Sequence, residues 1–593
     1  MKVGWLSTNL LASFFLVSLA SCGGGGDSTP PSPSPPAPTP PAVTLTYGGK
    51  QLRFSWAAVP GATHYRLFER ANAGAAFTQI GPDLATTRVT HDIAVHRRTN
   101  ATYRVDSCTN AGCTVLDTVS LAATLNQTIG YQQTGRGRSP VFDFGELCGN
   151  AVAVSADGNT RAVACSWLND TGPGFGRYRI GRVSVYVRVA EEWVFQDSFS
   201  ASNIQGGLPP PATDGQYFGA AVALSADGNT IAVSAPGESS NATGINGDQA
   251  NITAQNAGAV YVFAWTAGMW SMQAYVKASN TEAFDRFGSA VALSADGSTP
   301  TVGALNESSN ATGIDGNQAD NSAPGSGAVY VFTRAAGAWS QQAYVKASNT
   351  GGFDQFGGAV ALAGDGNTLA IGAYGEASIA NSVGGDQAND SAANAGAVYL
   401  FTRNAGTWLQ QAYVKASNTD ANDRFGQAVA LSSDGNTLAA AAQNEASSAR
   451  GIDGNQADNS ATNAGAVYLF SRAGGTWSQQ AYVKASNTEI DDGFGVAIAL
   501  SHDGNTLAVG ATGEDGNAKG VGGDQTDNSE RIAGAAYVFT RAANLWSQQA
   551  YVKASNTERF DSFGAAVALS ANGDTLAVGA PGKVMGGGAD YLY

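Results

Sequence analysis

The chain has 593 residues, 43% of them hydrophobic and 13% charged, with 75 glycines. That apolar content is enough for a packed core, so the composition excludes a disordered chain and is typical of short strands joined by tight turns. The net charge of −15 and the pI near 4.7 exclude nucleic acid as a partner, because binding phosphates requires a basic face.

The first 21 residues are expected to be a signal peptide. Lys2 precedes the apolar run LLASFFLVSLA at residues 10–20, which is shorter than the about 20 residues that span a bilayer. The run leads into Leu19-Ala20-Ser21-Cys22, a string that resembles a bacterial lipobox. The resemblance implies cleavage before Cys22 and a lipid on its thiol. The alternative is an ordinary secreted protein with a stray cysteine.

Residues 22–42 are expected to be a linker that follows the lipidated cysteine. They contain eight prolines and no periodic apolar residues, so they cannot pack a core and extend as a spacer. The lipid on Cys22 is therefore the one membrane contact that we expect. Through the same resemblance, Gly23 implies the outer membrane of a bacterial cell envelope, with the folded part either exposed at the surface or facing the periplasm.

Residues 43–123 alternate apolar and polar side chains in short runs separated by turns such as VPGA, which predicts a small β-sandwich. The segments LRFSWAAVPGATHYRL, with Trp56, and TYRVDSCTNAGC, with Tyr103 and Val105, resemble a fibronectin type III domain. The chain has no Arg-Gly-Asp tripeptide, so a spacer role is favoured for this domain.

Four cysteines remain once Cys22 is assigned to the lipid: Cys108, Cys113, Cys148 and Cys165. They form two local pairs, and disulfides are expected in an exported protein. The first pair spans a hairpin turn, and the second flanks a hairpin at residues 156–159, slightly out of register. Zinc is the alternative, but no histidine is near either pair in the sequence.

The rest of the chain, 124–593, repeats one pattern. A Phe-Gly pair recurs every 69 residues, at Phe218, Phe287, Phe356, Phe425, Phe494 and Phe563. Each unit contains two hairpin signals, of which the first turns at Asp-Gly. That turn occurs seven times, at Asp157, Asp227, Asp296, Asp365, Asp434, Asp503 and Asn572. We therefore predict an all-β chain with a seven-bladed propeller of four-stranded blades; an open solenoid is the alternative.

The last unit ends after its third predicted strand, at GGGADYLY. Tyr131 precedes Phe144 by a spacing close to that from Tyr275 to Phe287. A strand near 126–135 is therefore expected to complete the last blade. This strand would join the two ends of the propeller and leave no free sheet edge.

The unit FGAAVALSADGNTIAVSAPG, with Phe218-Gly219 and Ala235-Pro236-Gly237, resembles the FG-GAP repeat of the integrin α-subunit propeller. The resemblance implies a platform that contacts ligands through its loops. Calcium-binding FG-GAP repeats carry a Dx[DN]xDG loop between the first two strands. Here that loop is ADGNT, which has too few oxygens for the cation, so its aspartates are expected to be turn residues.

The long loops between the second and third strands are the candidate binding elements, because loops on a rigid scaffold usually carry binding. Each has an acid at the same position near its start: Glu238, Glu307, Glu376, Glu445 and Glu514. Further oxygen-bearing candidates are Asp315, Asn317, Asp320, Asp453, Asn455 and Asp458. A weak calcium site is one interpretation of these residues, and self-capping Asx turns are the other.

These features favour a non-catalytic adhesion or binding lipoprotein with a protein or glycan ligand. No catalytic motif is present in the sequence. The one histidine of the repeats, His502, stands where sister units carry Ala226, Gly364 or Ser433, so it is a poor candidate for a general base. We therefore do not expect an enzyme. A periplasmic scaffold lipoprotein and, less favoured, a glycan-active enzyme are the alternatives.

Overall fold

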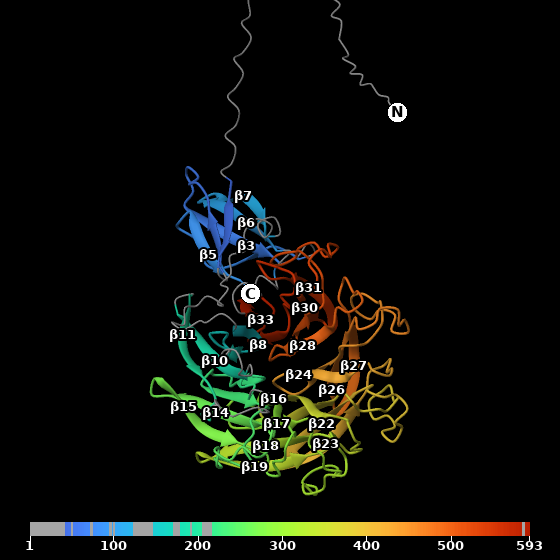
Figure 1. The fold of residues 1–593 in the computed structure, drawn as a ribbon. Coiled ribbons are helices and arrows are strands. Elements are labelled where there is room, and N and C mark those ends of the chain that lie inside the picture. Colours follow the sequence, from blue (N-terminus) through green and yellow to red (C-terminus); the bar gives the residue numbers. More distant parts are fainter. Residues whose placement is uncertain are drawn as a thin grey trace, which may run out of the picture. The chain divides into compact units, whose positions relative to one another are not determined.

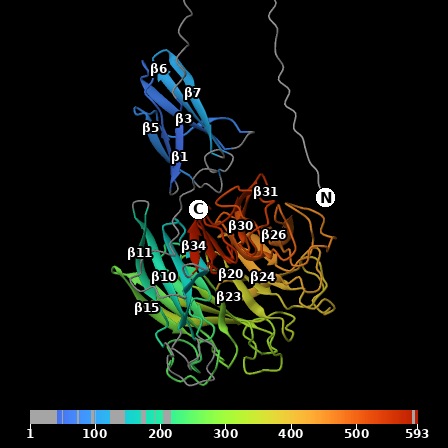
Figure 2. The ribbon, with the colours of Figure 1, turned by 45° about the horizontal axis from the view of Figure 1, so that its top comes forward.

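The computed structural model describes residues 42–48, 51–71, 75–93, 98, 101–121, 146–169, 178–189, 192–203, 216–583 and 588–593. The described elements are β-strands (Figures 1 and 2). The predicted signal peptide, Cys22, all of the linker but residue 42, and the strand predicted near 126–135 lie outside the described residues. Among the described residues, no helix has the length and apolar character needed to cross a membrane.

The N-terminal part contains two antiparallel sheets. One consists of β1 (Thr44–Gly48), β2 (Gln51–Ser55) and β5 (Arg88–Asp92), and the other of β4 (Thr78–Gln79), β3 (His64–Arg70), β6 (Thr102–Thr109) and β7 (Gly112–Ser120). Phe54 of the first sheet packs on Tyr103 of the second, with ring centroids 5.1 Å apart. Both rings are buried, as alternation in the two strands requires. The likeness to fibronectin type III stays a prediction.

Seven antiparallel sheets follow in chain order, six with four strands and the last with three. The first four sheets consist of β8 (Glu146–Val154), β9 (Thr160–Asn169), β10 (Tyr178–Val189), β11 (Glu192–Phe199); β12 (Val222–Leu224), β13 (Thr230–Ala235), β14 (Ala259–Thr266), β15 (Met269–Val276); β16 (Phe287–Leu293), β17 (Pro300–Ala304), β18 (Ala328–Ala335), β19 (Ala338–Val345); β20 (Phe356–Leu362), β21 (Thr368–Ala373), β22 (Ala397–Asn404), β23 (Thr407–Val414).

The remaining sheets consist of β24 (Phe425–Leu431), β25 (Thr437–Ala442), β26 (Ala466–Ala473), β27 (Thr476–Val483); β28 (Phe494–Leu500), β29 (Thr506–Ala511), β30 (Ala535–Ala542), β31 (Leu545–Val552); and β32 (Ala566–Leu569), β33 (Leu576–Ala580), β34 (Ala589–Leu592). We number the repeat units by these sheets, so that units two to six are residues 218–286, 287–355, 356–424, 425–493 and 494–562.

The Phe-Gly pair has a packing role in each unit. The Phe356 ring lies 5.3 Å from that of Tyr399 and 6.3 Å from that of Phe401 in the same unit. At Gly426, which follows Phe425, the backbone has φ +86°, and a Cβ would lie 2.5 Å from the carbonyl oxygen of Ala397. A side chain cannot fit there, so the pair marks where one sheet packs against the preceding one.

Backbone hydrogen bonds link the first hairpin turns of neighbouring sheets. The residue before each Asp-Gly or Asn-Gly turn donates its N–H to the carbonyl of the equivalent residue in the next sheet. Seven such bonds, each 2.9 Å long, connect Ala156, Ala226, Ala295, Gly364, Ser433, His502 and Ala571, and Ala571 donates to Ala156. The sheets therefore succeed one another in a propeller-like arrangement in which the last neighbours the first.

Both predicted cysteine pairings are present, as Cys108–Cys113 and Cys148–Cys165. The expectation that the second pair is out of register is wrong, because Cys148 pairs directly with Cys165 and a bulge before Val152 absorbs the odd spacing. Cys148 bridges Gly588 as Phe563 bridges Gly534. The first unit thus has Cys148-Gly149 at the position that Phe563-Gly564 has in the last unit.

Candidate binding face

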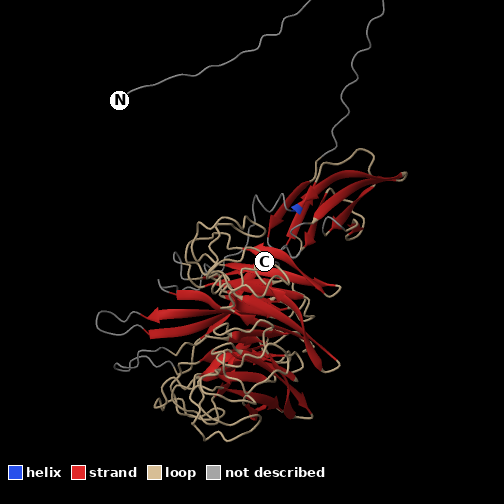
Figure 3. Cartoon of the chain, turned by 90° about the vertical axis from the view of Figure 1, so that its right-hand side faces the viewer, coloured by secondary structure: helices blue, strands red, loops and turns tan. Residues whose placement is uncertain are grey.

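The long loops between second and third strands lie at one side of the sheets (Figure 3). Antiparallel strands place these loops and the connections from fourth to first strands at the same end, and the two hairpin turns of each unit at the other end. A hydrogen bond shows that a connection and a long loop lie side by side: the N–H of Phe353 in the connection donates to the carbonyl of Pro324 in the long loop at 2.8 Å. We call this end the loop face.

The five predicted glutamates are buried under the loop face. Glu238, Glu307, Glu376, Glu445 and Glu514 are at most 1% exposed. Each forms an ion pair with the lysine that follows the fourth strand of its own unit; these lysines are Lys277, Lys346, Lys415, Lys484 and Lys553, at 2.8, 2.9, 2.9, 2.8 and 2.6 Å. The prediction that the glutamates contact a ligand is therefore corrected: they hold the start of each loop.

The cluster around Glu376 shows how this works. Its Oε2 accepts a hydrogen bond from Lys415 Nζ at 2.9 Å, and its Oε1 accepts bonds from the Tyr413 hydroxyl at 2.8 Å and from Asn349 Nδ2 at 3.2 Å. Asn349 belongs to the preceding unit, and its Oδ1 accepts from the hydroxyl of Tyr399 at 2.6 Å. We call this cluster the Glu–Lys brace; it ties one unit to the connection that leaves its neighbour.

A buried aspartate lies near each of these braces. Burial raises the pKa of Asp354 to about 7, and the negative charge of Glu376 adds to the rise. Burial likewise raises the pKa of Asp285 and Asp423 to about 7 and that of Asp492 to about 8. Burial lowers the pKa of Lys415, against the attraction of Glu376. The braces are thus coupled to groups that titrate near neutral pH.

The remaining predicted candidates lie in the outer parts of two loops. Asp315, Asn317, Asp453 and Asn455 are exposed, and Asp320 and Asp458 are half-buried. Asp315 Oδ1 accepts the N–H of Tyr344 at 2.9 Å, and Asp320 Oδ1 accepts the N–H of Ser322 at 2.8 Å. Asn317 Oδ1 accepts the N–H of Ala319 at 3.1 Å. The contacts of Asp320 and Asn317 are local caps, of the kind that the Asx-turn interpretation predicts, whereas Asp315 ties its loop to the fourth strand of the same unit.

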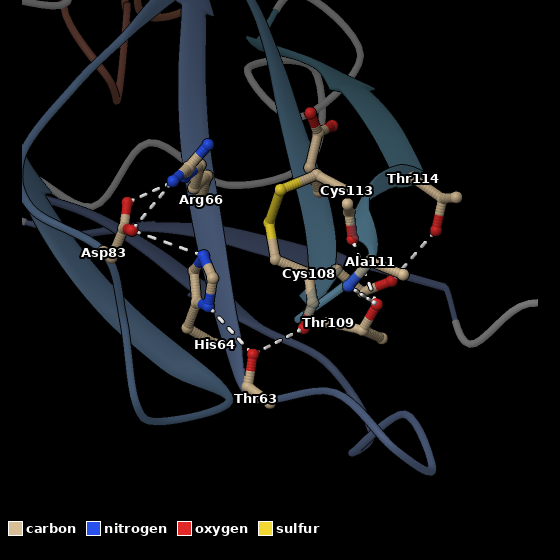
Figure 4. Close-up of a disulfide and its surroundings, with 12 residues drawn as sticks. Thr63, His64, Arg66, Asp83, Cys108, Thr109, Ala111, Cys113 and Thr114 are labelled. Atoms are coloured by element: carbon tan, nitrogen blue, oxygen red, sulfur yellow. Dashed lines mark hydrogen bonds and ion pairs between the residues drawn. A yellow bond between two sulfur atoms is a disulfide. The ribbon is translucent and has the colours of Figure 1, made fainter.

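A metal-binding cluster of acids is not found in these loops. Within the described residues, the group of His, Cys, Asp or Glu side chains close enough to share an ion is His64, Cys108 and Cys113. The two cysteines are bonded to each other, and His64 contacts Asp83 at 3.3 Å (Figure 4), so this group is not a metal site. Calcium in the long loops stays a prediction.

Three phenylalanines on the loop face were missed by the sequence reasoning. Phe284, Phe353 and Phe560 lie in fourth-to-first connections, have φ of 72°, 67° and 67°, and are 53%, 69% and 42% exposed. A left-handed conformation costs a bulky residue about 1–2 kcal/mol, and sister units place Asn422 and Asp491 there. Strain and exposure together point to a role in binding. Each lies three residues before the phenylalanine of a Phe-Gly pair, at Phe287, Phe356 and Phe563, and this shared position was the available signal.

Comparison with known proteins identifies the repeats. The FG-GAP repeat matches residues 339–401, 408–470, 477–539 and 546–593, so the chain contains FG-GAP repeats from 339 to its last residue. No curated protein matches the chain.

Two solved structures show distant likeness. One is the NanB sialidase from Streptococcus pneumoniae, with 9% identity over 93% of this chain and 94% of that chain and a TM-score of 0.31. The other is a Ca2+-stabilized adhesin with which an Antarctic bacterium binds ice, with 11% identity over 74% and 94% and a TM-score of 0.12. Superpositions this distant do not indicate a shared activity.

Proposed function

We propose that this protein is a lipoprotein of the bacterial cell envelope whose FG-GAP propeller is a non-catalytic platform for binding a protein or glycan. The observation that carries the proposal is the construction of the loop face. Each long loop is fixed at its start by a Glu–Lys brace with a buried lysine, while strained phenylalanines stand exposed beside the loops. Rigid support under exposed side chains suits recognition.

The proposal includes a closed propeller of seven blades. The seven turn-to-turn hydrogen bonds support it, since Ala571 donates to Ala156 at 2.9 Å. The three-stranded sheet β32–β33–β34 would take its fourth strand from residues near 126–135, which would leave no free edge on the ring.

The described repeats favour binding over catalysis. His502, the one histidine of the repeats, lies in a turn where sister units carry Ala226, Gly364 or Ser433. Its backbone takes part in the turn-to-turn bonds, and burial lowers the pKa of its imidazole. A group at so variable a position is a poor general base.

Protease treatment and antibody labelling of intact cells that express the full chain would test the proposal, with permeabilised cells as the control. We expect the propeller to be cut and labelled on intact cells. Protection until permeabilisation would overturn the adhesion function and favour a periplasmic scaffold.

A further inference from the structure

We infer that a hollow between units five and six on the loop face binds a neutral sugar, an inference that rests on the proposed binding function. The hollow has a volume of about 620 Å³ and is lined by the connection 490–493 and by parts of the long loops of both units. Pockets of this size accept small ligands. The long loop of unit six supplies Asp515 and Arg531 to its wall.

A glycine that sister units lack lines the hollow. Gly493 has φ +63°, and a Cβ there would point at the side chain of Gln443, 3.4 Å from its Nε2. Sister units carry Arg286, Gln355, Arg424 and Ser562 at this position. Arg286 and Arg424 adopt φ of 56° and 59°, so the backbone does not require glycine here. Four sister units thus carry a side chain at this position, and unit five has none.

The lining has the groups that recognise hydroxyls. Amides come from Gln443, Asn444 and Asn463, carboxylates from Asp491 and Asp515, and a guanidinium from Arg531. Such groups donate and accept hydrogen bonds in pairs, as adjacent hydroxyls of a sugar ring require. Two carboxylates against one guanidinium leave the wall negative, which disfavours acidic sugars.

Within the part of the chain that the structure describes, each of the two carboxylates accepts one hydrogen bond, through its Oδ1. Asp515 Oδ1 accepts the N–H of Ile532 at 2.6 Å, and Asp491 Oδ1 accepts from Asn463 Nδ2 at 2.8 Å. Each therefore keeps its second oxygen for a ligand. Arg531 is exposed, and within the described part of the chain its guanidinium makes no ion pair.

Apolar surface beside these groups suits the C–H face of a sugar ring. Ile490 lines the hollow and is 61% exposed, although sister units carry Ala283, Gly352, Ala421 or Arg559 there. The N–H of Phe560 donates to the carbonyl of Arg531 at 2.9 Å, which fixes the backbone of one of the strained residues to a residue of the wall. The guanidinium of Arg559 lies over the Phe560 ring, 4.8 Å from its centroid, so the apolar surface available in the hollow is that of Ile490.

The test is binding of the purified full chain to an array of neutral and acidic glycans and of basic peptides. We expect neutral glycans to be retained. Gly493→Arg, which introduces the side chain of units two and four, should weaken that binding at least tenfold with an unchanged melting temperature. Arg424→Gly makes the reverse change at the junction of units four and five. It is the matched control and should leave binding unchanged. Arg531→Ala gives a second test if Gly493→Arg does not fold.

The outcomes separate this inference from the proposed function. Undiminished binding by Gly493→Arg, with loss of binding when Phe284 and Phe353 are replaced by Asn, would overturn the sugar site and keep the platform. Retention of acidic glycans or basic peptides in place of neutral glycans would overturn the ligand class. Binding of no arrayed ligand by the unchanged protein would overturn the sugar site, and labelling of intact cells would then decide on the platform.

Discussion

The junctions inside the repeat array and the junction between its last and first sheets use different buried charges. Inside the array, one Glu–Lys brace is repeated in units two to six. In unit seven, Lys583 stands at the position of the glutamate and contacts Asp561 at 3.0 Å and Glu558 at 2.9 Å. The same brace is repeated where neighbouring units are alike, whereas at the contact between units six and seven a lysine replaces the glutamate and its partners are carboxylates of unit six.

The junction between the last and first sheets has a buried ion pair of its own. Arg161 and Asp590 form an ion pair of 2.8 Å with side chains 1% and 4% exposed, and the Arg161 guanidinium lies 4.7 Å from the rings of both Tyr186 and Trp193. Equivalent positions in other units hold Leu369 and Val398. Buried pairs of this kind can specify which surfaces meet, and here the pair makes the first and last sheets complementary to each other.

Breaking that pair should produce the largest loss of stability. Arg161→Leu leaves Asp590 charged and buried without its partner, which costs about 3–5 kcal/mol. The double variant Arg161→Leu, Asp590→Val restores the residue types of the sister units and should recover most of the loss. Denaturant unfolding of both variants measures this. A single variant as stable as the unchanged protein would show that the pair does not hold the end junction.

Breaking one brace should have a smaller and more local effect. Glu376→Ala leaves Lys415 buried and unpaired and frees the start of one loop. This should lower the free energy of unfolding by about 2–4 kcal/mol. The loss is smaller than at the end junction because solvent can reach the lysine from the loop face. Limited proteolysis should then cut between residues 375 and 396. Glu376→Gln keeps the size of the side chain and one acceptor oxygen but places an NH2 group against donors, so it should be cut to an intermediate extent, and equal cutting of all three proteins would contradict the role of the brace.

The buried aspartates predict a pH dependence of the free energy of unfolding. The folded-state pKa of Asp285, Asp354 and Asp423 is raised to about 7 and that of Asp492 to about 8. Their stabilising contribution is therefore complete below the ordinary aspartate pKa near 4 and is lost as the pH rises through 7 to 8.

Asp354→Asn tests this sign. The variant should be more stable than the unchanged protein at pH 9, by about 1 kcal/mol or more, and its stability should fall less between pH 5 and pH 9. Thermal melting across that range provides the measurement. A steeper fall in the variant would refute the assignment.

Calcium should have the smallest effect. The ADGNT turns are short, Asp320 is capped by its own turn, and Asp315 Oδ1 is bonded to the N–H of Tyr344, which leaves few oxygens for a cation that takes 6–8 ligands. We expect the melting temperature to change by less than about 1 °C when calcium is added or chelated. A rise of several degrees that Asp315→Asn and Asp320→Asn abolish would establish a calcium site in the long loops.

Local sequence patterns were sufficient to predict the sheets, both cysteine pairings and the turn role of Asp227, whose Oδ1 accepts the N–H of Asn229 at 2.9 Å. Regular periodicity and turn chemistry carry that information locally. The fate of Glu376 was not predictable from its loop, because its partners Lys415 and Asn349 come from other parts of the fold. Alignment of the five units would have singled out Gly493, because the other four units carry a side chain at this position.

The central claim is that the loop face binds a ligand, and paired surface variants test it most directly. Phe284, Phe353 and Phe560 are replaced by Asn, the residue of the sister unit at Asn422. In the control, Leu545, 76% exposed at the hairpin end, is replaced by Thr, the residue of sister units at Thr476. Binding to an array of glycans and matrix proteins is measured for both. We expect the first variant to lose at least tenfold in binding and the second to bind normally; equal binding by both would contradict the account.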